Sequence, residues 1–141
     1  MVVRVVRLGS ARVRGEGTRI GTVRRPPRGV PKSKFASQNW YDVWFPNLAP
    51  SLETMKLGQG AKTPAQWGVF TKRYRSEMAT PENRHAIELL AVLSRYTNFS
   101  VGCYCENEAH CHRSVLRELL TQKGASLETP APSFRDGGWT K

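Results

Sequence analysis

The fold is decided by residues 99–114, which read FSVGCYCENEAHCHRS. The first seven residues of this stretch are uncharged and mostly apolar, a pattern typical of a strand that is covered on both faces. A short polar loop follows, and then apolar residues at helical spacing predict a helix that ends near Gly124. A doubly covered strand that leads into a helix indicates an α/β layered fold with a largely parallel sheet flanked by helices.

The segments before this stretch supply the other elements of the predicted domain. Strands are expected at residues 2–8 and 19–24, because both carry β-branched residues and a glycine-containing turn separates them. One helix begins at Thr63, which can cap it ahead of a proline, and a second runs from about residue 82 to 95. The first helix is expected to bury Trp67, Phe70, Tyr74 and Met78, with a base-stacking platform as the alternative interpretation of this stripe. The second is expected to bury Ile87, Leu90 and Leu93 or near neighbours.

Three connecting segments have less regular patterns. Three prolines in residues 26–31 predict a stiff basic loop, and residues 40–45 predict a short strand or an aromatic loop that packs on the core. Residues 58–62 superficially resemble a phosphate-binding loop, but the required Gly-x4-Gly-Lys-Ser/Thr spacing is absent. A flexible connector is therefore expected there.

The length of the chain restricts its organisation. A chain of 141 residues has room for one domain of ordinary size and not for two independent cores. We expect a single domain over residues 1–124 and a tail, rich in Pro and Gly, over residues 125–141.

The positive charge is concentrated in the first quarter of the chain. Residues 1–34 hold ten Lys and Arg residues and one acid, Glu16, for a net charge of +9. The remaining 107 residues hold twelve basic and ten acidic residues, which adds only +2 to the total of +11. This distribution points to a polyanionic or phosphate-bearing partner that contacts the N-terminal quarter.

Other features bear on compartment. No apolar run approaches the roughly 18 residues needed to span a bilayer, and the start of the chain has no pattern of a secretory signal. The three cysteines lie within nine positions of one another, which does not fit a disulfide framework. We therefore expect a cytoplasmic protein that does not associate with membranes.

The strand-to-helix junction is the predicted ligand site. In open α/β sheets, ligands bind beyond the carboxyl ends of the strands, where helix N-termini present unpaired amides. Arg113 and Ser114 fall in the first turns of the predicted helix, where the helix dipole disfavours a cation unless an anion is bound. Both are therefore predicted to bind an anion; the alternative is that Arg113 pairs with Glu106 or Glu108 on the surface.

The junction also holds a candidate metal site. Cys103 and Cys105 are two apart on a strand and share a face, while Cys111 and His112 come from the start of the helix. Three thiols and one imidazole are a donor set for tetrahedral zinc. The spacing differs from the usual Cys-x2-Cys pairs, however, and buried cysteines often act as small apolar residues. Both interpretations stay open from the sequence.

A reactive thiol is the third interpretation of the same segment. A helix N-terminus and a neighbouring His112 or Arg113 would lower the pKa of a cysteine, which makes Cys111 and His112 candidate catalytic residues. The Cys-x5-Arg spacing of a tyrosine-phosphatase loop is absent, since seven residues separate Cys105 from Arg113. Phosphatase chemistry of that type is therefore not expected.

Four segments, in this order, resemble family 488 of the domains of unknown function (DUF488), which includes the YeaO-like proteins. They are RRPPRGV at 24–30, DVWFPNLAPS at 42–51, the aromatic stripe Trp67, Phe70 and Tyr74, and Cys105-Glu106 with Cys111-His112-Arg113. The resemblance implies a compact α/β domain and no defined reaction. The chain differs from YeaO-like members in having Val23 where they commonly have Asp.

The two informative segments can meet in one pocket. If the second strand and the strand that ends at Cys105 are parallel, Arg24, Arg25 and Arg28 emerge at the same sheet edge as the cysteine-rich junction. We therefore expect a pocket that binds a phosphate-containing ligand, either nucleic acid or a nucleotide. The alternatives are a hydrolase or transferase that uses Cys111 or His112, and a zinc-stapled structural or interaction module.

Overall fold

The computed structural model describes residues 1–128, and the predicted tail lies outside the described residues from 129 onward. Within the described part, four parallel strands form one sheet in the order β1-β4-β2-β3. The strands are β1 (Val3–Arg7), β2 (Thr18–Gly21), β3 (Val43–Trp44) and β4 (Phe99–Cys103). The predicted α/β fold with a parallel sheet is confirmed.

Strand β4 lies between β1 and β2, and every one of its residues is buried. Gly102 is required there because a Cβ atom at this position would lie 2.7 Å from Leu8 and 2.9 Å from the Val6 carbonyl oxygen. The close approach lets β1 pair with β4 in register up to Arg7 and Cys103. The ends of these two strands therefore lie side by side.

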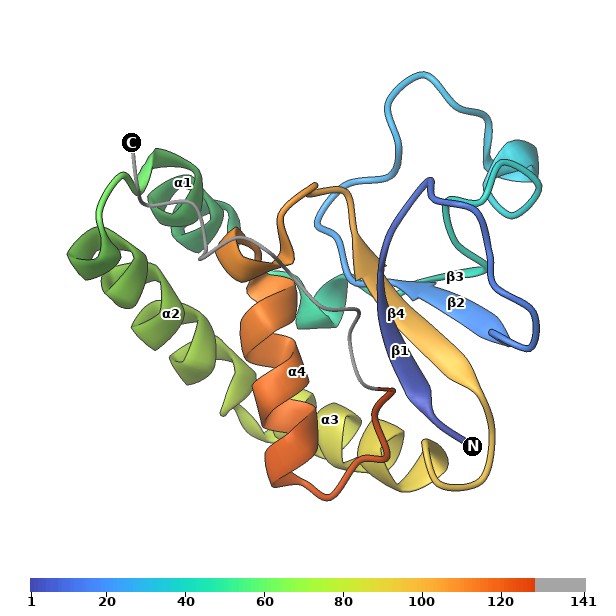
Figure 1. The fold of residues 1–141 in the computed structure, drawn as a ribbon. Coiled ribbons are helices and arrows are strands. Elements are labelled where there is room, and N and C mark those ends of the chain that lie inside the picture. The colour runs from blue at the N-terminus through green and yellow to red at the C-terminus, as the bar shows by residue number, and fades with distance from the viewer. Residues whose placement is uncertain (129–141) are drawn as a thin grey trace.

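The helices gather on one side of the sheet (Figure 1). They are α1 (Leu52–Gly60), α2 (Pro64–Met78), α3 (Pro81–Leu93) and α4 (His112–Gln122). Short 3-10 turns occur at Lys32–Lys34, Pro46–Leu48 and Glu108–His110. No helix within residues 1–128 is long and apolar enough to cross a membrane.

Helix α1 contradicts the flexible connector expected at residues 58–62. The Ser51 side chain caps this helix by accepting a hydrogen bond from the Thr54 amide at 3.2 Å. Gly58 belongs to the last turn, where a Cβ atom would lie 2.8 Å from the Phe70 ring of α2. The glycine therefore allows two helices to pack closely and does not mark a loop.

Most of the predicted core is confirmed, but Trp67 is only half-buried and Leu93 is exposed. Phe70, Tyr74 and Met78 are buried on one face of α2, and Ile87 and Leu90 are buried on α3. The third predicted position was Leu93 or a near neighbour; Leu93 itself is 38% exposed, and the adjacent Ser94 is buried. Ile87 and Ser94 are seven residues apart, so they lie on the same face of the helical segment, and both are buried. Leu93 lies at the border of this buried face.

Residues 125–128 continue along the sheet. Leu127 forms an isolated parallel bridge with Val3, and the Val3 amide donates to the Ser126 carbonyl at 2.8 Å. The last described residues therefore run beside the free edge of β1.

Candidate functional site

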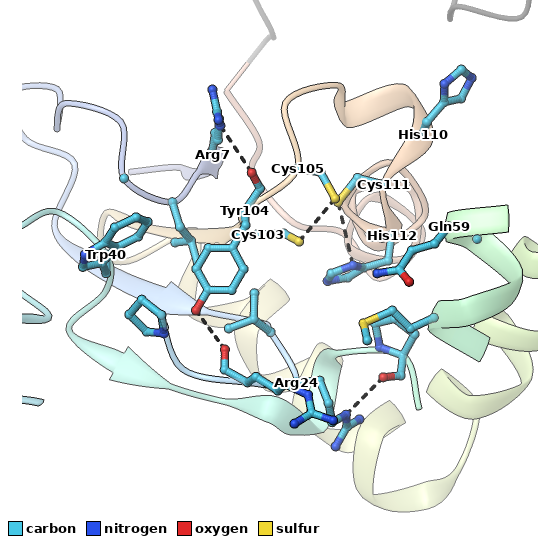
Figure 2. Close-up of a pocket in the computed structure, with 18 of the residues that line it drawn as sticks. Arg7, Arg24, Trp40, Gln59, Cys103, Tyr104, Cys105, His110, Cys111 and His112 are labelled. Atoms are coloured by element: carbon cyan, nitrogen blue, oxygen red, sulfur yellow. Dashed lines mark hydrogen bonds between the residues drawn. The ribbon is translucent and has the colours of Figure 1, made fainter. Parts of the chain in front are cut away.

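A cavity of about 810 Å³ lies where the chain leaves β1, β2 and β4. Its walls come from both ends of the sequence. Arg7 and Leu8 follow β1, Val23 to Arg28 follow β2, and residues 103–105 and 110–112 come from the end of β4 and the start of α4. Helices α1 and α2 close the opposite side with Gln59 and Trp67 (Figure 2). This is the carboxyl edge of a parallel sheet, the usual position of ligand sites in such folds.

The thiols and one imidazole meet inside this cavity. The Sγ atoms of Cys103 and Cys105 are 3.8 Å apart, and the Sγ atom of Cys111 is 3.8 Å from Nδ1 of His112 (Figure 2). The ligand atoms of Cys103, Cys111 and His112 all lie within 4.8 Å of one another, and these three residues are buried. This cluster of the described residues could therefore hold a metal ion.

A backbone hydrogen bond fixes the orientation of His112. Its Nε2 atom lies 2.8 Å from the carbonyl oxygen of Thr22, which can only accept a hydrogen bond. Nε2 must therefore carry the proton in this contact, which leaves the lone pair of a neutral imidazole on Nδ1, facing Cys111. Nδ1 is thereby placed to accept a proton from the thiol or to ligate a metal.

The thiols of the cluster differ in acidity. Contacts from Cys103 and Cys105, with a further contribution from His112, hold the pKa of Cys111 well below its ordinary value despite burial. The contact with Cys105, then the contact with Cys111 and burial, raise the pKa of Cys103. Contact with Cys103 lowers the pKa of Cys105, but contact with Cys111 and burial outweigh it and bring it to about 11. Cys111 is therefore the first thiol to ionise.

The loop between β4 and α4 is held by arginines from the helix below it. Arg113 is buried and donates to the Cys105 carbonyl oxygen at 2.6 Å, while Arg117 binds the Glu108 carboxylate at 2.7 and 3.1 Å. Cys111 occupies the N-cap of α4 without making a capping hydrogen bond through its side chain. Its thiol is therefore free to join the cluster.

The predicted anion-binding residues separate into two groups. Arg24, Arg25 and Arg28 line the cavity together with the cluster, as expected from parallel strands. Arg113 and Ser114 are not among the lining residues, and Ser114 donates to the Cys111 carbonyl oxygen at 3.0 Å. Neither Glu106 nor Glu108 pairs with Arg113, because their carboxylates face Arg7 and Arg117. Both proposed surface pairs of Arg113 are therefore wrong.

The cavity arginines differ in how firmly they are held. Arg24 donates to the carbonyl oxygens of Pro50 and Ala49 at 3.1 and 3.0 Å, which fixes its guanidinium against the start of α1. Arg25 and Arg28 are exposed, and their side chains make no hydrogen bond or ion pair with residues 1–128. These two guanidinium groups keep all their donors for a ligand.

Several lining residues were not predicted as site residues. Arg7 reaches the site because it pairs with Cys103 in the β1–β4 register, which the sequence does not specify. Trp40 and Tyr104 meet edge to face with ring centroids 5.9 Å apart, and the Tyr104 hydroxyl donates to the Arg25 carbonyl oxygen. Trp67 was predicted to lie in the core, with a base-stacking platform as the alternative, and it is half-buried and also lines the cavity.

Comparison with known families agrees with the sequence resemblance. A family model described as the active DUF488-N3 subclade, DUF488-N3a, matches residues 3–124. The chain therefore belongs to the DUF488 family. No curated protein and no solved structure matched the chain.

Proposed function

We propose that the cavity binds a phosphate-bearing nucleotide, either free or as part of a nucleic acid strand. The observation that carries this proposal is that one cavity is lined by four arginines and by half-buried aromatic rings. Guanidinium groups bind phosphate in bidentate geometry, and aromatic rings stack on bases. The volume of about 810 Å³ lies within the range of roughly 300–1,000 Å³ that is usual for small-molecule sites.

The arginines suggest how the phosphate is held. Arg24 is held by two backbone carbonyl groups, so its positive charge has a fixed position. Arg25 and Arg28 are exposed, and their side chains would turn toward the bound phosphate. Their charges are not cancelled by acids in the lining, since no Asp or Glu of residues 1–128 lines the cavity. An anion in this site would replace mutual repulsion among the guanidinium groups with attraction.

The aromatic rings suggest where a base lies. Trp40 and Tyr104 form one wall, and Tyr104 is tied through its hydroxyl group to the backbone of Arg25. We call the segment that carries Arg24, Arg25 and Arg28 the arginine loop. A base against the aromatic wall would place its phosphate beside this loop, because the hydrogen bond from Tyr104 to Arg25 joins the wall to the loop. Stacking is tolerant of base identity. We therefore expect affinity to depend strongly on the phosphate group and only weakly on which base the nucleotide carries.

Calorimetric titration of the full chain tests this function. Nucleoside 5′-phosphates, the matching nucleosides, and short single-stranded DNA and RNA are the ligands. We expect nucleotides or oligonucleotides to bind and nucleosides without phosphate to bind much more weakly. Equal affinity for nucleosides and nucleotides, or no binding of any of the four classes, would contradict the proposal. A preference for oligonucleotides over mononucleotides would identify a strand as the ligand.

The contact between Cys111 and His112 favours a second candidate, a hydrolase or transferase acting on the bound nucleotide. In this reaction the Cys111 thiol would pass its proton to Nδ1 of His112, and its sulfur would form a bond to an electrophilic atom of the substrate. The bond to the leaving group would break with its electron pair, and that group would take the proton from His112. Water or a second acceptor would then release the product from sulfur.

A conservative substitution tests this candidate. Cys111→Ser should abolish turnover of a nucleotide or oligonucleotide substrate while the circular dichroism spectrum stays unchanged. His85→Gln is the control, because His85 is exposed and does not line the cavity. Turnover that survives Cys111→Ser would contradict a nucleophilic role.

A further inference from the structure

The cysteine cluster, which consists of Cys103, Cys105, Cys111 and His112, contains two pairs of donor atoms at close to the spacing of tetrahedral metal ligands. Zinc binds thiolate sulfur at about 2.3 Å and imidazole nitrogen at about 2.0–2.1 Å, so tetrahedral ligands lie about 3.8 Å apart for two sulfurs and about 3.5 Å for sulfur and nitrogen. The Cys103 and Cys105 sulfurs are 3.8 Å apart, and the Cys111 sulfur is 3.8 Å from His112 Nδ1. The donor atoms of Cys103, Cys111 and His112 already lie within 4.8 Å of one another.

His112 has the surroundings of a metal ligand. Metal-binding histidines usually donate their second ring N–H group to a carboxylate or a backbone carbonyl, which fixes the tautomer and the ring orientation. The Nε2 atom of His112 lies 2.8 Å from the Thr22 carbonyl oxygen, and the imidazole ring packs edge to face on Tyr74. Thr22 and Tyr74 are fully buried, so the ring is held on a rigid support.

The backbone around the cluster is equally restrained. Cys103 ends the central strand β4, and Cys111 and His112 begin α4. The loop that carries Cys105 is tied down by the buried Arg113, which donates to the Cys105 carbonyl oxygen. The donor atoms are therefore positioned by secondary structure before any ion binds, which lowers the entropic cost of binding.

The charge around the cluster also suits a thiolate-rich site. Three thiolates and one neutral imidazole around a divalent ion leave a net charge of −1. The cluster lies in the same cavity as four arginines, and Cys111 is at the N-terminal end of an eleven-residue helix. Both features favour negative charge at this position.

We propose that Cys103, Cys105, Cys111 and His112 bind one zinc ion in a Cys₃His site that opens onto the cavity. Cys103, Cys111 and His112 form the buried part of the site, and Cys105 is the exposed fourth ligand. In the loaded protein Cys111 is a metal ligand and is not a free nucleophile. Measuring the metal content of the protein therefore also distinguishes a zinc site from a hydrolase or transferase that uses Cys111 as its nucleophile.

The full chain, purified without chelators, tests the site directly. We expect one equivalent of zinc by elemental analysis, and protection of all three thiols from a thiol reagent until a chelator is added. Cobalt added to the metal-free protein should give the visible bands of tetrahedral coordination and the near-ultraviolet bands of thiolate charge transfer. Less than stoichiometric metal after reconstitution, with no such bands, would overturn the proposal.

Variants separate metal binding from loss of folding. Cys105→Ser changes an exposed side chain, so the fold should persist while the cobalt charge-transfer band weakens and zinc affinity falls by more than tenfold. His85→Gln changes an exposed histidine outside the site and should leave the cobalt spectrum and zinc affinity unchanged. Unchanged affinity and spectrum in Cys105→Ser would remove Cys105 from the ligand set and contradict the Cys₃His assignment.

Discussion

Two polar clusters are buried in this domain, and they differ in how completely their atoms are paired. In the first, Arg19 donates to both oxygens of Glu16 and to the carbonyl oxygens of Ser10 and Asn39, and Ser100 donates to the same carboxylate. In the second, the cysteine cluster, the donor atoms face mainly one another and the cavity. A saturated network stabilises the fold, whereas an unsaturated one that opens on a cavity can bind a ligand.

The basic residues of the N-terminal quarter also fall into two groups, those with an acidic partner and those without. Arg19, Arg12 and Arg4 are paired with Glu16, Asp42 and Glu128, so they are structural although they belong to the basic first quarter. Arg25 and Arg28 line the cavity, and their side chains have no ion-pair partner in the part of the chain that the structure describes. The charge available for a ligand is therefore much smaller than the +9 of residues 1–34 suggests.

The largest effect should come from breaking the saturated cluster. Arg19→Ala leaves the Glu16 carboxylate, which is 2% exposed, without its ion-pair partner in the interior. The free energy of unfolding should fall by about 3–5 kcal/mol, as is typical when one member of a buried ion pair is removed. Chemical denaturation measures this change. A loss of less than about 1 kcal/mol would show that the network is not needed for the fold.

The next effect concerns the unpaired cavity arginines. The double substitution Arg25→Ala with Arg28→Ala should weaken nucleotide binding by about tenfold or more for each arginine, because a charge-assisted hydrogen bond contributes about 1.5–3 kcal/mol. Stability should change little, since both side chains are exposed and lack partners. The matched control replaces Arg14 and Arg84, which are exposed and outside the cavity lining. An equal loss of affinity in the control would assign the effect to net charge alone.

A third, comparable or smaller effect is expected at the aromatic wall. Trp40→Ala should lower nucleotide affinity by the roughly 1–3 kcal/mol that a stacked base contributes, and Trp40→Phe should restore most of it. Titration calorimetry on both variants provides the measurement. If the phenylalanine variant binds as weakly as the alanine variant, base stacking does not explain the role of Trp40.

The smallest effect is an acid destabilisation of the saturated cluster and similar contacts. Burial raises the pKa of Glu16, but hydrogen bonds from Arg19, Ser100 and Val13 outweigh this effect, so the pKa lies below its ordinary value. Hydrogen bonds from Ser51 and Thr54 lower the pKa of Glu77 in the same way. Carboxylates with a lowered pKa stabilise the fold fully above their ordinary value of 4.5, and this contribution is lost as pH falls through the lower folded value.

Denaturation at a series of pH values between about 6 and 3 measures this loss. The variant Glu77→Gln should be less stable at neutral pH and show a shallower decline on acidification, because its side chain no longer titrates. A decline as steep as that of the wild type would exclude Glu77 as a contributor.

The sequence predicted the site as far as local patterns reach. The uncharged run of residues 99–105 and the helix behind it placed the cysteines at a strand-to-helix junction, and parallel strands brought Arg24, Arg25 and Arg28 to the same edge. Strand order and register were not specified, so Arg7 was missed. Trp40 was missed as well, because it reaches the cavity from a long loop whose path depends on tertiary contacts.

The sequence also did not predict the direction in which the Arg113 side chain points. Arg113 lies in the first turn of α4, where an anion site is expected, yet its guanidinium turns inward to the Cys105 carbonyl oxygen. Helical position alone does not decide between these directions, because the folded loop above the helix supplies the acceptor. Gly58 misled in a similar way, since its packing partner Phe70 lies on another helix.

The most direct test of phosphate binding at the arginine loop is the salt dependence of oligonucleotide affinity in two double variants. Wild-type affinity should fall linearly on a logarithmic plot against salt, and replacing Arg25 and Arg28 by alanine should reduce that slope by about 2. Replacing Arg14 and Arg84 should leave the slope close to that of the wild type. Equal slopes in all three proteins would contradict the assignment of Arg25 and Arg28 to the phosphate groups of the ligand.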